Sequence, residues 1–189
     1  MLVPDMITKS RKILMLSTDV QIDRRILLQA DSLEEDGWNV TILAIHHGNV
    51  ASISPDDSRV VRLGQDGVSP RKVSVLLSAY RILRRFLPMD GFLMRAARAF
   101  AWRFLVDQER FYLNMFLQDG LKYKADVVVS HDLPMLAVGR ALADSFDAKL
   151  VYDSHELYCE QELSRSQRLR WERVERRYIS SCDHVITVN

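Results

Sequence analysis

The chain has 189 residues, 48% of them hydrophobic and 27% charged, which is the composition of a globular domain rather than of a disordered segment. Its formal net charge of +1 excludes a global attraction to nucleic acid or to a membrane, so any such preference must be local. It has no apolar stretch of bilayer-spanning length and no CxxC pair, so we expect a cytoplasmic protein with reduced thiols.

The first part of the chain alternates apolar strands with an amphipathic helix. Residues 23–38 predict the helix, because apolar side chains recur there at spacings of three and four, and Gly37 is placed to end it. Strands are predicted before this helix, directly after it and beyond a polar loop, at residues 12–18, 39–45 and 59–63.

The following segment interrupts this alternation and predicts a basic insert of two helices at about 73–117, divided at Pro88. The two helices are predicted at residues 73–87 and 91–117. Nine basic and three acidic residues between positions 71 and 110 give this region a net charge of +6. The rest of the protein is therefore acidic.

The last part of the chain returns to alternating strands and helices. Strands are predicted at residues 125–130, 149–152 and 184–188, and helices at residues 134–146 and 167–181. Strand–helix alternation predicts a parallel sheet with helices on both faces. The expected fold is α/β, with residues 1–189 forming one Rossmann-like three-layer domain.

Polar side chains follow three of the predicted strands. They are Asp19, Asp23, Arg24 and Arg25 after the first strand, His131 and Asp132 after a second, and Asp153, His155 and Glu156 after a third. In an open parallel sheet, ligands bind outside the carboxyl ends of the strands, near the point where strand order reverses. These residues are therefore the candidate site.

Each of these residues also has a structural interpretation. Asp23 and Asp132 are both placed to cap the helix that follows. His131 has the alternative role of a hydrogen-bonded structural histidine, and residues 153–156 that of a solvated loop. At least one of the two arginines after Asp23 is expected to be a surface charge.

Several motifs of nucleotide and hydrolytic chemistry are missing. The sequence has no GxGxxG after the first strand, no GxxxxGK[ST] phosphate loop and no GxSxG elbow, which argues against a dinucleotide site, a P-loop and an α/β-hydrolase. The stretch HELYC from His155 to Cys159 carries a cysteine where HExxH has its second histidine, so it indicates metal ligation only weakly.

Four stretches resemble, in the expected order, the N-terminal domain of a GT-B-fold glycosyltransferase of the large retaining family four. They are KILMLSTDVQIDRRILLQADSLEEDGWNVTILA, ADVVVSHDLPMLAVGRALA, KLVYDSHELY and WERVERRYISSCDHVITVN. The chain departs from the family in having Asp19-Val20-Gln21 where many members have a Gly-Gly pair. The family's second Rossmann-like domain, which holds most of the nucleotide-sugar site and a Glu-x7-Glu element, is absent from these residues.

The resemblance implies retaining transfer of a sugar from a nucleotide-sugar donor to an acceptor hydroxyl, with no bound metal or other cofactor. It implies that His131 is the catalytic residue, contacting the donor sugar or the acceptor near the reacting centre. Asp153, His155 and Glu156 are expected on the acceptor side together with Asp132, Asp19 and Asp23, and Arg24 or Arg25 near phosphates. The implied partners are the donor, bound mainly by the missing domain, and an acceptor glycan or lipid-linked acceptor. No nucleic acid is expected.

Three other functions remain open at this point. The chain is also compatible with one half of a split transferase, with half of a sugar-nucleotide epimerase, and with a noncatalytic module that anchors an assembly to a membrane. The isolated chain is expected to be inactive, because a transferase needs donor and acceptor held together.

The basic insert suggests a peripheral association with an anionic membrane, as in family members with lipid-linked acceptors. Its arginines alternate with large apolar side chains, which is the composition of an interfacial helix. The arginines are Arg81, Arg84, Arg85, Arg95, Arg98 and Arg103. The alternatives are that the apolar side chains pack on the sheet, or that the arginines bind phosphates of the acceptor.

Overall fold

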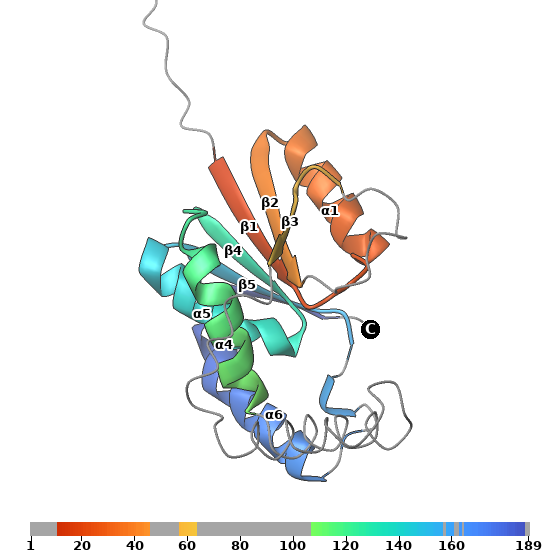
Figure 1. Cartoon of the computed structure of the whole chain (residues 1–189), viewed down its shortest axis with the longest axis vertical. Helices are drawn as coiled ribbons and strands as arrows, with labels where there is room; N and C mark the ends of the chain where they lie inside the picture. Colours follow the sequence, from red (N-terminus) through yellow and green to blue (C-terminus); the bar gives the residue numbers. More distant parts are fainter. Residues whose placement is uncertain are drawn as a thin grey trace, which may run out of the picture.

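The computed structural model describes residues 11–45, 57–63, 107–156, 158–160, 163 and 165–187. These residues form one six-stranded sheet with helices on both faces (Figure 1). The strands are β1 (Arg11–Ser17), β2 (Trp38–Ile45), β3 (Val60–Leu63), β4 (Val127–His131), β5 (Lys149–Ser154) and β6 (His184–Thr187). The helices are α1 (Arg24–Glu35), α4 (Gln108–Gly120), α5 (Leu133–Phe146) and α6 (Arg165–Tyr178), with short 3₁₀ turns η4 (Tyr158–Glu160) and η5 (Ile179–Ser181).

The sheet has the order β3-β2-β1-β4-β5-β6, and every neighbouring pair is parallel. The order reverses between β1 and β4, so the carboxyl ends of these two strands mark the point where doubly wound sheets bind ligands. The prediction of an α/β Rossmann-like domain is confirmed.

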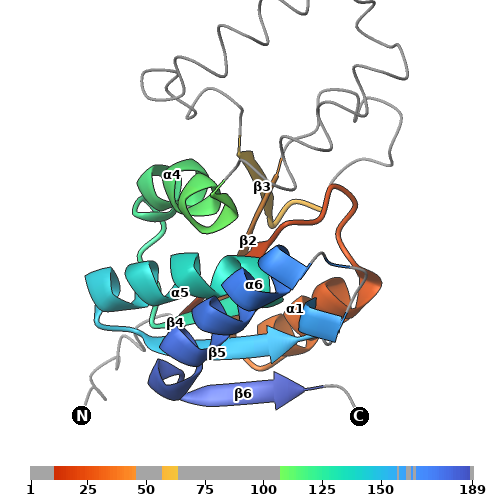
Figure 2. The ribbon, with the colours of Figure 1, turned by 90° about the horizontal axis from the view of Figure 1, so that it is seen from below.

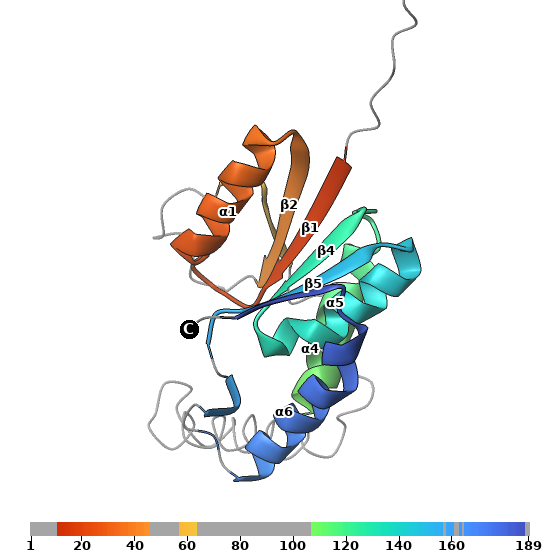
Figure 3. The ribbon, with the colours of Figure 1, turned by 180° about the vertical axis from the view of Figure 1, so that it is seen from behind.

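Helix α1 covers one face of the sheet, and α4, α5 and α6 lie on the opposite face (Figures 2 and 3). The centre of strand β1, from Ile13 to Leu16, is continuously apolar because it is buried on both faces. Ile13 and Met15 pack in the core beneath α1, whereas Leu14 and Leu16 pack in the core beneath α5. A strand buried on both faces needs an apolar side chain at every position rather than at alternate ones.

Helix α5 lies close to the sheet at Gly139. A methyl group at this position would overlap Ser130 Oγ on β4 and lie 3.0 Å from a methyl carbon of Leu150 on β5. The hydroxyl of Ser130 in turn donates a hydrogen bond to the carbonyl of Met135, 3.2 Å away. This contact fixes α5, and with it the residues that connect β4 to α5.

The basic insert differs from its prediction where the structure describes it. The predicted helix at residues 91–117 does not run through Asp107, whose backbone is extended and whose side chain accepts a hydrogen bond from the amide of Arg110. Helix α4 begins after this cap and continues to Gly120. The first predicted helix and all six arginines proposed for membrane contact lie outside the described residues. None of the described helices is long and apolar enough to cross a membrane.

Candidate functional site

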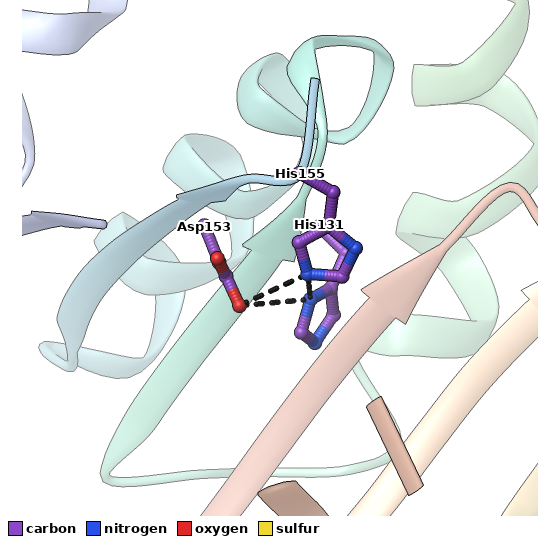
Figure 4. Close-up of side chains that lie close together, drawn as sticks. All are labelled: His131, Asp153 and His155. Atoms are coloured by element: carbon purple, nitrogen blue, oxygen red, sulfur yellow. Dashed lines mark hydrogen bonds and ion pairs between the residues drawn. The ribbon is translucent and has the colours of Figure 1, made fainter. Parts of the chain in front are cut away.

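Two neighbouring strands bring the predicted site residues together at the carboxyl edge of the sheet. His131 is the last residue of β4 and is paired in register with Asp153 of β5, and His155 follows directly after β5. Figure 4 shows the three side chains converging. Asp153 Oδ2 lies 3.1 Å from His155 Nε2 and 3.4 Å from His131 Nδ1, and the two ring nitrogens are 3.2 Å apart.

The members of this cluster differ in how far solvent reaches them. His131 is 1% exposed and Asp153 is 7% exposed, so both are buried at the end of the sheet rather than on an open surface. His155 is only partly buried, and Glu156 is exposed. Within the part of the chain that the structure describes, His131 Nε2 is buried and has no hydrogen-bond partner. The solvated-loop interpretation therefore fails for Asp153.

Hydrogen bonds within the cluster shift the pKa values of Asp153 and His155. Burial raises the pKa of Asp153, but the hydrogen bonds with His131 and His155 outweigh burial and bring this pKa below its ordinary value. The same contact with Asp153 raises the pKa of His155, against the opposing effect of burial. Asp153 is therefore an ionised carboxylate, and it favours a positive partner.

Asp132 connects the two strand ends instead of capping α5 with its side chain. Its carboxylate accepts no hydrogen bond from the first turn of α5 and accepts one from the amide of His155, at 2.9 Å. Its own amide donates to the carbonyl of Asp153, also at 2.9 Å. Burial raises the pKa of Asp132, and the hydrogen bond from His155 opposes this rise. Asp132 thus sets the position of the backbone on both sides of the cluster.

Asp23 is the cap of α1 that the sequence predicted. Its carboxylate accepts a 2.8 Å hydrogen bond from the amide of Arg25 and pairs with the Arg25 guanidinium, also at 2.8 Å. These contacts lower the pKa of Asp23 to about 2. Arg24 is exposed at the start of the helix and Arg25 is half exposed. A role for either arginine in binding phosphate stays a prediction.

Two residues of the site were missed by sequence reasoning. Gln29 of α1 donates a 3.3 Å hydrogen bond to Asp153 Oδ2 across the sheet edge. Arg62 of β3 donates to the carbonyls of Asp19 and Ile45, at 3.0 and 3.1 Å, and so ties the ends of three strands together. The sequence contains a signal for each of these residues. Gln29 is a polar residue on the apolar stripe of its helix, and Arg62 is a charged residue inside an apolar strand.

The chain matches the family model described as a glycosyl transferase 4-like domain over residues 22–189. This range includes all of the described helices and every strand except β1. No curated protein matches the chain.

Proposed function

The chain belongs to the glycosyl transferase 4-like domain family, and we propose that it is the acceptor-side domain of a retaining glycosyltransferase that uses a nucleotide-sugar donor. The observation that supports this proposal most strongly is the polar cluster of His131, Asp153 and His155 at the carboxyl edge of the sheet. The cluster lies beside the switch point between β1 and β4, where a doubly wound sheet binds its ligand.

The charges of the site suit glycosyl transfer. As the bond to the leaving group breaks, positive charge develops at the sugar carbon and negative charge on the departing phosphate. The carboxylates of Asp132 and Asp153 favour the first charge. The exposed Arg24 and the half-exposed Arg25, at the amino end of α1, are proposed to favour the second.

His131 is proposed to contact the substrate through Nε2. Its Nδ1 faces Asp153 and His155, which fixes the ring, and Nε2 is left without a hydrogen-bond partner among the described residues. A buried nitrogen without a partner costs free energy in the absence of a ligand. Because Nε2 is buried, contact requires a small opening at this edge of the sheet.

The donor is proposed to bind mainly to a second domain outside these 189 residues. Catalysis of group transfer depends on holding both reactants in register, so half of the binding surface is insufficient. We expect residues 1–189 alone to transfer no sugar and to bind nucleotide sugars weakly. Calorimetric titration with a panel of nucleotide sugars tests this, and micromolar binding to the isolated chain would contradict it.

The reaction itself is tested in a protein that contains both halves. We expect transfer from at least one labelled nucleotide sugar, with the anomeric configuration of the donor kept in the product, as read by proton NMR. His155→Ala should lower kcat, whereas the exposed His184→Ala on β6 should not. Inverted products would refute retention, and equal kcat values for the two variants would remove the site assignment.

A further inference from the structure

We propose that His131, Asp153 and His155 form a binding site for a divalent transition metal of the zinc class. The three side chains offer two imidazole nitrogens and one carboxylate oxygen, and these atoms lie within 4.8 Å of one another (Figure 4). This inference rests on their geometry and does not depend on the proposed transfer reaction. It differs from the expectation, taken from the family resemblance, that no metal binds.

The triangle of ligand atoms has the size that a metal ion requires. Its edges are 3.1, 3.2 and 3.4 Å. Zinc binds histidine nitrogen and carboxylate oxygen at about 2.0–2.1 Å, so tetrahedral angles place such ligands about 3.3–3.4 Å from one another. An ion slightly out of the plane of the three atoms therefore reaches all of them with only small side-chain shifts.

Hydrogen bonds alone satisfy this triangle poorly. If both histidines direct an N–H at Asp153 Oδ2, the two N–H groups face each other across 3.2 Å. If only one histidine carries this proton, the other turns a nitrogen lone pair toward the carboxylate or toward its neighbour. A dication among the three atoms is attracted to every lone pair. With His131 Nδ1 as a ligand, the ring proton lies on Nε2, which has no hydrogen-bond partner among the described residues and can donate to an oxygen of water or of a substrate.

The scaffold fixes these ligands before any ion binds. His131 and Asp153 lie on adjacent, hydrogen-bonded strands, and both are buried. Gln29 Nε2 donates to Asp153 Oδ2, and Asp132 holds the backbone amide of His155. Ligands oriented in this way by neighbouring groups are typical of protein metal sites. The carboxylates of Asp132 and Asp153 also make the surroundings negative, which favours a cation.

The ligand set indicates which ions are preferred. Two imidazoles and one carboxylate suit zinc, iron(II) and cobalt(II), whereas magnesium and calcium prefer sites made of oxygen atoms. Three protein ligands leave at least one coordination position for water or for an oxygen of a substrate, as in catalytic zinc sites.

Equilibrium dialysis of the full, tag-free chain, stripped with a chelator, tests the site. We expect one equivalent of Zn²⁺ to bind saturably, and Mg²⁺ at the same concentration to bind not at all. Co²⁺ should give visible absorption bands typical of low-coordinate cobalt with nitrogen and oxygen ligands, which Zn²⁺ then abolishes by competition. The absence of saturable Zn²⁺ binding, or of these bands, would overturn the proposal.

Variants locate the ion. Asp153→Asn, which keeps the shape of the side chain, and His155→Ala, at the more accessible ligand, should each weaken Zn²⁺ binding by more than about tenfold. The chain has five histidines, so the other three serve as controls in His46→Ala/His47→Ala and in His184→Ala, which should bind like the parent chain. Loss of binding in a control, or its retention in both ligand variants, would refute this site. Circular dichroism without metal identifies any variant that is unfolded, and the cobalt spectrum of the parent chain tests for a bound ion without variants.

Discussion

Asp132 holds the most unusual backbone of the described residues, with φ 62° and ψ 163°. Residues other than glycine adopt this region at a cost of roughly 1–3 kcal/mol, and such strain is concentrated at functional sites. The strained peptide lets the amide of Asp132 reach Asp153 while its carboxylate reaches the amide of His155. The strain is therefore linked to the geometry of the polar cluster.

Substitutions at Asp132 separate the strain from the hydrogen bond. Asp132→Asn keeps an acceptor oxygen and should change the free energy of unfolding by less than about 1 kcal/mol. Asp132→Ala keeps the strain and leaves the amide of His155 without its acceptor, at a cost of about 1–3 kcal/mol. Asp132→Gly loses the acceptor but relieves the strain, so it should lie between these two. Urea denaturation measures the order, and an alanine variant at least as stable as the glycine variant would contradict it.

The Asp23 cap gives a pH-dependent prediction. The pKa of Asp23 is lowered to about 2 in the folded protein, whereas an unfolded aspartate titrates at about 3.9. A lowered folded pKa means that the stabilisation is complete above the unfolded pKa and is lost as the pH falls toward the folded pKa. Asp23→Ala should therefore cost about 0.5–2 kcal/mol at pH 7, and this difference should shrink below about pH 4.

Urea denaturation of both proteins between neutral and mildly acidic pH measures this difference. Glu35→Ala, at an exposed carboxylate at the end of α1, provides a comparison outside the cap. A difference between Asp23→Ala and the parent chain that stays constant down to pH 3 would show that the cap stabilises α1 by something other than charge.

The sequence predicted which residues form the polar cluster, but not how they contact one another. His131, Asp153 and His155 were predicted as site residues because each follows an apolar run. Their direct contact depends on β4 and β5 being neighbours in register, which no local pattern specifies. The contribution of Gln29 was missed for the same reason, because its partner is 124 residues away along the chain.

At the scale of elements, the strands and helices were predicted to within a few residues where apolar runs are long and caps are clear. Gly37, with φ 83°, ends the first helical segment as expected. The largest difference within the described residues is at Asp107, which interrupts the predicted second helix of the insert. Its capping role depends on a single side-chain contact, and this is a weaker signal than the apolar pattern around it.

The contact of α5 with β4 gives a prediction at this scale. Gly139→Ala should lower the free energy of unfolding by about 1–3 kcal/mol, because the added methyl group overlaps Ser130 Oγ and the core has no room for it. Ser130→Ala removes that oxygen, so the double variant should lose less stability than the sum of the two single variants. Denaturation of the four proteins gives the coupling, and strictly additive losses would show that the helix moves away instead.

At the scale of the whole molecule, charge is distributed unevenly along the chain. Residues 71–110 carry +6, so the remainder of a chain with net charge +1 carries −5. The described domain contributes Asp132 and Asp153 at the carboxyl edge of its sheet. Two regions of opposite charge are consistent with a domain that binds a surface with one region and a substrate with the other.

We predict that the insert attaches the protein reversibly to an anionic membrane surface. Each basic residue close to an anionic leaflet contributes on the order of 1 kcal/mol, and this attraction falls as salt rises. The chain should therefore co-sediment with vesicles that contain an anionic lipid at low salt, less so at high salt, and not with neutral vesicles. Arg81→Gln/Arg84→Gln/Arg85→Gln should weaken this binding, because three positive charges are removed from one predicted helix.

The other two roles of the insert give different results in the same experiment. If its apolar residues only pack on the sheet, the chain stays in the supernatant with every vesicle. If its arginines bind phosphates of the acceptor, inorganic pyrophosphate should displace the chain from anionic vesicles. Chloride added to the same ionic strength should not displace it. Arg168→Gln/Arg170→Gln/Arg173→Gln on α6 controls for net charge, because it removes three exposed arginines outside the insert. An equal loss of binding in the two triple variants would show that total charge, and not the insert, determines attachment.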